Sequence, residues 1–254
     1  MYLLLKHRRD MARGSGSRTP VFLTTEWRHL AMLNYEIVPE ALEPYLPAGT
    51  VLDTWRGKHY ISVVGLLFRD TRLYGVPVPF HRDFEEINLR FYVRREVAGE
   101  VRRGVVFIKE IVPKRAVTFV ARALYNENYA TLPTSHSVER QGAGLAVSYE
   151  WRQTDFTHSL RVQAADAPHL IRDGSEEEFI AEHYWGYAAQ RDGGTLEYEV
   201  EHPRWHIRRI DNATLHCDVE RLYGGEFADH IGNTPDSALL ADGSPVIVRK
   251  GVRI

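Results

Sequence analysis

The sequence has little of what several common classes of protein require. Its 254 residues include one cysteine, Cys217, so no disulfide can form within the chain and a reducing, cytoplasmic location is expected. No Cys/His pattern has zinc-finger spacing, which argues against structural zinc. Lysine and arginine (32) nearly balance aspartate and glutamate (34), giving a net charge of −2. That balance predicts neither nucleic acid nor an anionic membrane as a partner.

Several motifs and segment types are also missing. The chain has no GxSxG, no phosphate-binding glycine loop and no GxGxxG. The apolar run Tyr2–Leu5 is too short for the apolar part of a signal peptide or for a transmembrane helix. The residues after it are basic and then rich in glycine and serine. We therefore expect residues 1–20 to form a disordered basic leader, with a weak membrane or nucleic-acid tether as the alternative.

Apolar residues make up 44% of the sequence and aromatic residues 11%, which is sufficient for a substantial core. Alternating, β-branched and aromatic-rich segments predominate, so residues 21–254 are predicted to form one mostly antiparallel β domain with two or three helices. Strands are expected at 50–55 and 58–68 (a hairpin around Arg56 and Gly57), 84–94, 106–112, 137–140, 145–152, 158–164, 196–201, 205–209, 215–219 and 246–254. Helices are expected near 39–46, 113–125 and 174–189.

The segment Phe84–Arg94 gives the clearest strand pattern. Its odd positions, from Ile87 to Val93, are apolar, whereas Glu86, Asn88 and Arg90 share the other face. If that polar face meets solvent, these residues are ordinary surface charges. If the sheet curls into a barrel, the same face lines a polar interior, where a carboxylate such as Glu86 could orient a substrate or transfer protons.

The segment 104–125 changes from a strand pattern to a helix pattern at Pro113. Lys114 and Arg115 are thereby placed in the first helical turn, where the macrodipole disfavours cations by roughly 0.3–1 kcal/mol each. The segment 174–189 follows the opposite rule, with Ser175 and Glu178 forming a capping box. A helix N-terminus and a cationic neighbour both lower a lysine pKa, so Lys114 is a candidate nucleophile. The alternative is an exposed basic pair at a strand–helix corner.

Two further groups of residues have the chemistry of a binding site. The run from His81 to Glu86 is rich in oxygen and nitrogen ligands, but no distant partner has diagnostic spacing, so no metal site is predicted. Trp185, His202 and Trp205 could line a pocket for an apolar ligand. Their alternative role is as amphipathic aromatic residues packed at the edge of the core.

Several segments together resemble the DUF2071, or YqjF-like, family. They are VPEALEPYLPAGTVLDTWRGKHYISVVGLLFRDTRL, FEEINLRFYV, GSEEEFIAEHYWGY and HPRW. That family is grouped by remote similarity with acetoacetate decarboxylase. The resemblance implies a mainly β (α+β) fold, in which a large antiparallel sheet closes into a cone-shaped barrel with an internal active site and two or three flanking helices.

The resemblance also implies roles for particular residues. The run EIVPKR, residues 110–115, is similar to the Pro-Lys-Lys element of acetoacetate decarboxylase, in which the first lysine forms a Schiff base and the second depresses its pKa. Lys114 and Arg115 would take these positions, and Glu86 would match the active-site glutamate. Two features depart from that pattern: arginine replaces the second lysine, and Ile111 and Val112 replace a glycine-containing turn.

These observations lead to two functional hypotheses for the chain. In the first, it is a Schiff-base lyase without metal or organic cofactor, acting on a small keto acid or related carbonyl or carboxylate compound through Lys114, Arg115 and Glu86. In the second, it is a non-catalytic binding module that uses Asn88, Arg90, Trp185, His202 and Trp205. A filled structural barrel is a third reading. A homo-oligomer is compatible with the β-rich surface.

Overall fold

The computed structural model describes residues 19–119 and 126–254. The predicted leader and the second half of the helix predicted at 113–125 therefore lie almost entirely outside the described residues. Residues 115–119 are helical, and the Lys114 carbonyl accepts the first hydrogen bond of that turn, from the Thr118 N–H. Among the described residues, no helix is both long and apolar enough to cross a membrane.

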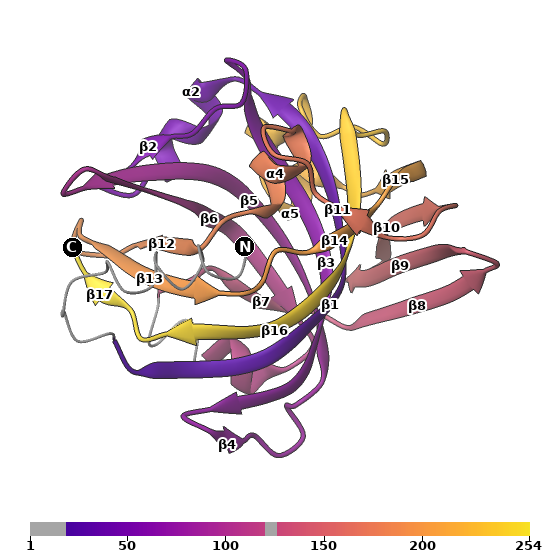
Figure 1. Cartoon of the computed structure of the whole chain (residues 1–254), viewed down its shortest axis with the longest axis horizontal. Coiled ribbons are helices and arrows are strands. Elements are labelled where there is room, and N and C mark those ends of the chain that lie inside the picture. Colours follow the sequence, from indigo (N-terminus) through magenta and orange to yellow (C-terminus); the bar gives the residue numbers. More distant parts are fainter. Residues whose placement is uncertain (1–18, 120–125) are drawn as a thin grey trace, which may run out of the picture.

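Most strands belong to one large mixed sheet, whose path runs β11-β14-β16-β1-β3-β5-β6-β12-β13-β17. A further pairing joins β13 to β16, so the strands from β16 through β6 to β13 form a ring around a central space (Figure 1). The pairs are antiparallel except that β6 runs parallel to β7 and β12. The elements of this sheet are β1 (Val21–Ile37), β2 (Val51–Leu52), β3 (His59–Leu73), β4 (Val76–Pro77), β5 (Phe84–Val97), β6 (Glu100–Val112), β7 (Tyr129–Thr131), β11 (His169–Leu170), β12 (Trp185–Ala189), β13 (Thr195–Glu201), β14 (His206–Arg208), β16 (Ser237–Arg249) and β17 (Val252–Arg253).

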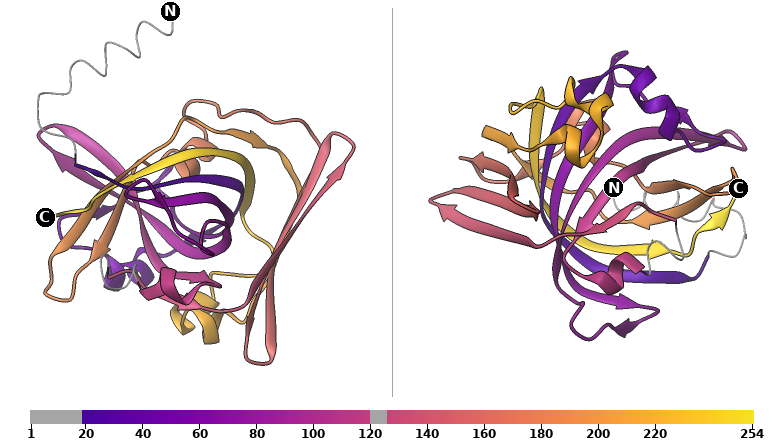
Figure 2. Two further views of the ribbon diagram at one scale, coloured as in Figure 1. Left: turned by 90° about the horizontal axis from the view of Figure 1, so that it is seen from below. Right: turned by 180° about the vertical axis from the view of Figure 1, so that it is seen from behind.

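A second sheet of four strands, in the order β15-β10-β9-β8, stands to one side of the ring (Figure 2). Its strands are β8 (Thr134–Gln141), β9 (Gly144–Gln153), β10 (Phe156–Ala164) and β15 (Ile210–His216). The helices are short: α2 (Pro39–Leu42), the 3-10 turn η1 (Glu43–Tyr45), α4 (Glu176–Ala181), α5 (Val219–Leu222) and α6 (Gly225–Ala228). The sequence predicted these β8 and β9 partners but not their separation into a second sheet.

The two sheets pack face to face through an apolar cluster. Alternate residues of β5, from Ile87 to Val93, contact this cluster, and Tyr149 and Trp151 of β9 contribute from the second sheet. Gly65 of β3 makes the close approach possible, because a Cβ atom there would lie 2.4 Å from the Tyr149 ring. The other face of β5 points into the central space, where Glu86 and Arg90 line a cavity, so β5 is buried on both sides. The polar face of β5 is thus interior.

Two expectations about local structure were wrong. The helix predicted at 174–189 ends at Ala181, and Trp185–Ala189 is instead strand β12, paired with both β13 and β6. The Ser175 cap is present, since its hydroxyl accepts the Glu178 N–H at 3.3 Å, but tertiary pairing overrides helix propensity beyond one and a half turns. The turn at Arg56 and Gly57 forms. The strand before it, β2, pairs with β5, whereas the predicted hairpin would have paired it with β3.

Candidate functional site

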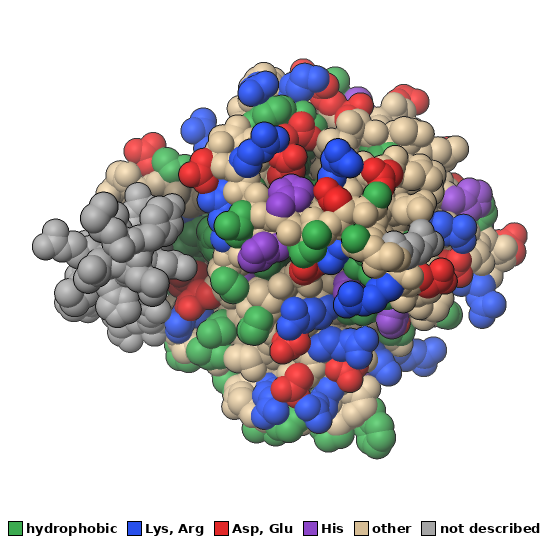
Figure 3. All heavy atoms as spheres, turned by 45° about the vertical axis from the view of Figure 1, so that its right-hand side comes forward, with side chains coloured by type: hydrophobic (Ala, Val, Ile, Leu, Met, Phe, Trp, Pro, Cys, Tyr) green, Lys and Arg blue, Asp and Glu red, His purple; other side chains and the backbone are tan. Residues whose placement is uncertain are grey.

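The central space contains a cavity of about 210 Å³. Its walls are largely aromatic and aliphatic, which is typical of small-molecule sites. The apolar wall residues include Phe22, Trp27, Phe68, Phe84, Val105, Phe107, Trp185, Val200, Trp205 and Val248. Acidic and basic side chains are interspersed over the outer surface shown in Figure 3, so the apolar interior contrasts with a mixed-charge exterior.

One end of the cavity reaches the protein surface. Ala116 is exposed, and Val78, His81 and Val117 are partly exposed, while all four line the cavity. These residues come from the loop after β4 and from the helical turn at 115–119. A ligand could therefore enter between these two segments. The deeper residues, including Glu86, Glu110 and Glu127, are at least nine-tenths buried.

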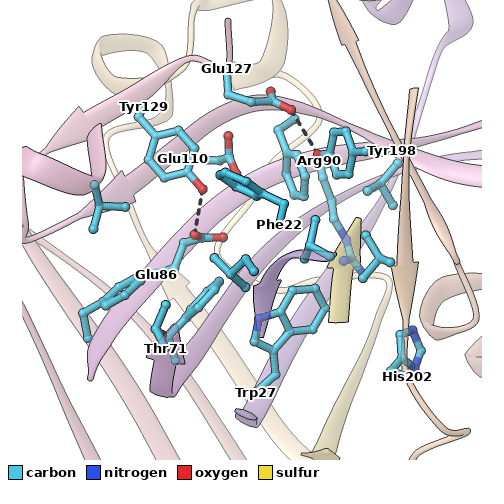
Figure 4. Close-up of a pocket in the computed structure, with 18 of the residues that line it drawn as sticks. Phe22, Trp27, Thr71, Glu86, Arg90, Glu110, Glu127, Tyr129, Tyr198 and His202 are labelled. Atoms are coloured by element: carbon cyan, nitrogen blue, oxygen red, sulfur yellow. Dashed lines mark hydrogen bonds between the residues drawn. The ribbon is translucent and has the colours of Figure 1, made fainter. Parts of the chain in front are cut away.

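Three buried carboxyl groups meet at one side of the cavity (Figure 4). The strand registers explain why: Glu110 of β6 lies opposite Asn88 of β5, two residues from Glu86, and it also pairs in register with Tyr129 of the parallel strand β7. Glu127 lies two residues before the start of β7. Neighbouring strands therefore bring together residues that are 41 positions apart in the sequence, Glu86 and Glu127.

Hydrogen bonds distinguish these carboxyl groups. Glu86 accepts at both oxygens, from Asn88 Nδ2 at 3.1 Å and from the Tyr129 hydroxyl at 3.1 Å. Glu127 accepts from the Tyr198 hydroxyl at 3.0 Å. Glu110 Oε2, by contrast, has no hydrogen-bond partner within the described part of the chain. A buried oxygen without a partner is costly, and this one lies on the cavity wall.

The carboxyl cluster has raised pKa values because its members are removed from water. Burial raises the pKa of Glu86 to about 7, although hydrogen bonds from Asn88 and Tyr129 and the charge of Arg90 oppose the rise. Burial also raises the pKa of Glu127 to about 8. The pKa of Glu110 is raised well above its usual range by burial and by the charges of Glu127 and Glu86. Glu110 is consequently held toward its neutral form.

A β-bulge in β6 determines which side chains face the cavity. Arg90 of β5 pairs with Phe107 but the preceding Leu89 pairs with Lys109, so Ile108 is an extra residue. Phe107 and Glu110 both line the cavity as a result. Lys109 points to the other face, where its ammonium donates to the Leu222 carbonyl. Under strict alternation along 106–112, the Glu110 side chain would point to the same face of β6 as Ile108. The bulge breaks that pattern.

A basic group borders another part of the cavity. Arg90 is largely buried, and its guanidinium donates to the Ile180 carbonyl at 3.2 Å. Its Nε atom has no partner, and no described carboxylate forms an ion pair with it. Nearby, the His202 ring stacks on Trp205 with centroids 4.1 Å apart, and burial lowers the pKa of His202. Arg90 is the only lysine or arginine among the described cavity-lining residues.

The structure brings together most of the residues singled out from the sequence. Glu86, Arg90, Trp185, His202 and Trp205 all line the cavity. Asn88 is buried beside Glu86. Lys114 and Arg115 are not among the described cavity-lining residues. Lys114 is partly exposed, and Arg115 is exposed beside a separate surface hollow with Phe119 and Arg191. The catalytic roles predicted for these two residues remain predictions.

Sequence reasoning missed Glu110, Glu127, Tyr129 and Tyr198 as site residues. Glu110 had a usable signal, because it is an acidic residue that directly precedes the buried apolar residues Ile111 and Val112 of the same strand. Glu127 and Tyr129 follow a segment with no clear period, and nothing local indicates that they face a cavity. No three or more His, Cys, Asp or Glu side chains in the described ranges converge in a way that could hold a metal ion.

The ring of strands matches the fold of acetoacetate decarboxylase-like proteins of known structure. The chain is similar to an acetoacetate decarboxylase-like enzyme from Sphingomonas wittichii RW1, with a TM-score of 0.64, 12% identity, and coverage of 92% of this chain and 93% of that one. It is also similar to acetoacetate decarboxylase from Legionella pneumophila, with a TM-score of 0.61, 12% identity, and coverage of 94% and 89%. The enduracididine biosynthesis enzyme MppR, in complex with pyruvate, gives a TM-score of 0.63, 12% identity, and coverage of 94% and 93%.

At such low identity these likenesses establish the fold and nothing more. The sequence itself belongs to the DUF2071 family, described as an uncharacterized conserved protein, because the family model matches residues 24–245. No curated protein matches the sequence. The family and the fold expected from the sequence are both confirmed.

Proposed function

We propose that this protein binds a small carbonyl compound with an apolar body in its interior cavity and polarises the carbonyl oxygen. The apolar walls would accommodate the body of the ligand. A carboxyl group that stays neutral can donate a hydrogen bond to a carbonyl, which an ionised carboxylate cannot do. The likeness to MppR, whose structure contains pyruvate, supports a carbonyl or carboxylate ligand.

The observation that carries this proposal is the state of Glu110. Its side chain is 97% buried, it lines the cavity, and its Oε2 atom has no partner in the described residues. A group of this kind is stabilised when a ligand supplies the missing hydrogen bond. Glu110 therefore marks the position at which the ligand's carbonyl oxygen would lie.

A pair of matched ligands tests the proposal. 2-Tetralone carries a carbonyl group, and tetralin is the same bicyclic hydrocarbon without it. Titration calorimetry should show one molecule of 2-tetralone bound per chain, at least about tenfold more tightly than tetralin, since one good hydrogen bond is worth about 1.5 kcal/mol. Glu110→Leu should abolish the difference between the two ligands. Equal binding of both by the wild-type protein, or binding of neither, would contradict the proposal.

Schiff-base lyase chemistry at Lys114 is a second candidate function. It is favoured by the resemblance of residues 110–115 to the Pro-Lys-Lys element and by the position of Lys114 three residues before Val117, which borders the cavity mouth. Incubation with pyruvate or acetoacetate followed by borohydride would trap an imine as a stable adduct. An adduct that disappears in Lys114→Ala would support this chemistry. Absence of any adduct would leave carbonyl binding as the function.

Some of the sequence-based expectations remain predictions. They include the cytoplasmic location, for which the single cysteine is the only argument, and the formation of a homo-oligomer. A keto acid in particular would require a cation for its carboxylate, and Arg90 is the described cavity residue suited to that role.

A further inference from the structure

We infer that Glu86 and Glu110 act as a base and an acid that convert a bound ketone to its enol, with no lysine taking part. This inference rests on the proposed function, because it requires the ketone to be held at Glu110. It adds a reaction, proton transfer at the carbon next to the carbonyl, and assigns a catalytic role to each of the two carboxyl groups.

Glu86 is suited to accept a proton. Both of its oxygens already accept hydrogen bonds, from Asn88 and Tyr129, and such bonds favour the ionised form of a carboxyl group. Arg90, four positions beyond Glu86 on the same face of β5, adds a favourable charge. With a pKa of about 7, a substantial fraction of Glu86 is ionised at neutral pH, and its strength as a base matches the working pH.

Glu110 is suited to the opposite role. Burial disfavours the ionised form of Glu110, and the neighbouring carboxyl groups of Glu127 and Glu86 disfavour a further negative charge. Its Oε2 atom is free to contact a ligand, whereas the Glu86 oxygens are both engaged with protein donors. When two titratable groups in one apolar site are driven to opposite protonation states, one can serve as base and the other as acid.

Tyr129 connects the two carboxyl groups. Its hydroxyl donates to Glu86 Oε2 at 3.1 Å, and Tyr129 pairs in register with Glu110 on the neighbouring strand β6. Figure 4 shows the Tyr129 hydroxyl above Glu86 with Glu110 alongside. A hydroxyl both donates and accepts, so Tyr129 can pass a proton between the two groups after each turnover.

An independent feature also indicates that a polar ligand belongs in this cavity. Arg90 Nε is without a partner although the residue is 92% buried and lines the cavity. A buried donor without an acceptor is costly, and a bound molecule could supply that acceptor. The carboxyl cluster is therefore not the only part of the wall with unsatisfied hydrogen-bonding capacity.

The reaction balances within the site. A Glu86 oxygen takes a proton from the carbon next to the carbonyl, and the electrons of that C–H bond form a carbon–carbon double bond. The carbonyl π electrons move to oxygen, which takes the Glu110 proton. Glu86 is then protonated, Glu110 is ionised, and the ligand is an enol. Transfer of one proton from Glu86 to Glu110 through Tyr129 restores the starting state.

Hydrogen–deuterium exchange tests this inference directly. 2-Tetralone dissolved in D₂O is followed by proton NMR, with and without the protein at pH 7. The wild-type protein should accelerate the loss of the signals from the protons on the two carbons that flank the carbonyl. Glu86→Gln should slow the protein-catalysed exchange about 100-fold or more, and Glu110→Leu should slow it about 10- to 100-fold.

A matched control and a folding control complete the experiment. Glu85 is the sequence neighbour of Glu86, but it faces the second sheet and bonds Thr134 at 2.9 Å, so Glu85→Gln should leave the exchange rate unchanged. Circular dichroism and 2-tetralone affinity show whether Glu86→Gln is still folded.

Wild-type exchange at the buffer rate while 2-tetralone is bound would overturn this inference and leave the proposed function standing. Failure of 2-tetralone to bind would overturn both. Exchange that survives in Glu86→Gln but is lost in Lys114→Ala would replace the inference with imine chemistry.

Discussion

The hydroxyl of Tyr198 donates a hydrogen bond of 3.0 Å to Glu127 Oε1, although the two residues are 71 positions apart. Tyr198 belongs to β13 and Glu127 lies two residues before β7, so this contact joins two separate parts of the cavity wall (Figure 4). The bond lowers the pKa of Glu127 but does not cancel the effect of burial, which leaves that pKa at about 8.

The raised pKa of Glu127 predicts a stability that falls as the pH rises. Below pH 4.5 both folded and unfolded chains are protonated at this residue, and the full stability is present. Between pH 4.5 and about 8 the unfolded chain releases the proton first, so the free energy of unfolding decreases. A shift from 4.5 to about 8 corresponds to about 5 kcal/mol. Glu127→Gln should reduce the loss of stability between pH 5 and pH 8.5, as measured by urea denaturation.

The same measurement on a surface residue provides the control. Glu150 is partly exposed and pairs with Arg161 in the second sheet, so Glu150→Gln should retain the pH dependence of the wild-type protein. If Glu127→Gln and wild type lost stability in parallel across this range, the carboxyl at 127 would not be held neutral in the folded state.

His158 predicts a separate sensitivity to acid. Its ring is fully buried, stacks on Trp151 with centroids 5.4 Å apart, and accepts the Asp218 N–H at its Nδ1 atom. Burial lowers the pKa of His158 to about 4. The stability due to the neutral ring is therefore fully present above pH 6.5. Between pH 6.5 and about 4 the unfolded chain binds the proton first, so the free energy of unfolding decreases as the pH falls. His158→Phe should weaken this acid dependence, as measured by urea denaturation at pH 4.5 and 7.5.

An unchanged acid dependence in His158→Phe would show that other groups govern it. The substitution also removes the acceptor for the Asp218 N–H, which should cost about 1 kcal/mol at pH 7.5. His81 is a suitable comparison because it lies in a loop at the cavity mouth, and His81→Phe should leave the acid limb of the stability curve as it is in wild type.

Gly65 predicts how closely the two sheets must pack. A methyl group at this position would meet the Tyr149 ring at 2.4 Å, and that ring is fully buried. Gly65→Ala should therefore lower the free energy of unfolding by about 1–3 kcal/mol, the usual cost of overpacking. In the background of Tyr149→Leu, the same change should cost distinctly less. Equal costs in the two backgrounds would mean that Tyr149 is not the obstacle.

The position of Glu110 predicts that an amine can be placed in the cavity by one substitution. Glu110→Lys puts a lysine beside Glu86 and Glu127, where burial would lower its pKa and favour the neutral amine, while the neighbouring carboxylates would oppose that shift. We expect Glu110→Lys to form a borohydride-trappable adduct with 2-tetralone, detected by intact mass. Glu85→Lys, on the other face of β5, should give no such adduct. An adduct in both variants would indicate nonspecific surface reaction.

The sequence was sufficient to predict those parts of the structure that depend on local pattern. The alternation of β5 identified the polar face of Glu86, Asn88 and Arg90, and the capping residues located the start of α4. The end of α4 was predicted wrongly because Trp185–Ala189 is held as a strand by the next strand, β13, and by β6, which is remote in sequence. Whether the polar face of β5 was interior could not be decided from its own residues. That depended on the pairing of β13 with β16, which returns the strands to a ring.

The candidate site was predictable to a similar degree. Residues on regular strands, such as Glu86 and Arg90, were identified because period-two alternation places them on one face. Glu110 was missed because the extra residue at Ile108 shifts that alternation, and Glu127 because it lies in a loop positioned by β6 and β7. Site residues of this kind can be identified only when the strand registers are known.

The bulge at Ile108 has a consequence for how such an interior can change. Lys109 and Glu110 are adjacent in the sequence but point to opposite faces of β6, one toward Leu222 and the other into the cavity. A slip of one residue in the pairing of β6 beyond the bulge would exchange them. An acid-lined and an amine-lined interior are thus a single register step apart in this fold. A small insertion or deletion in either strand, without any substitution at the site, would be enough to replace one chemistry with the other.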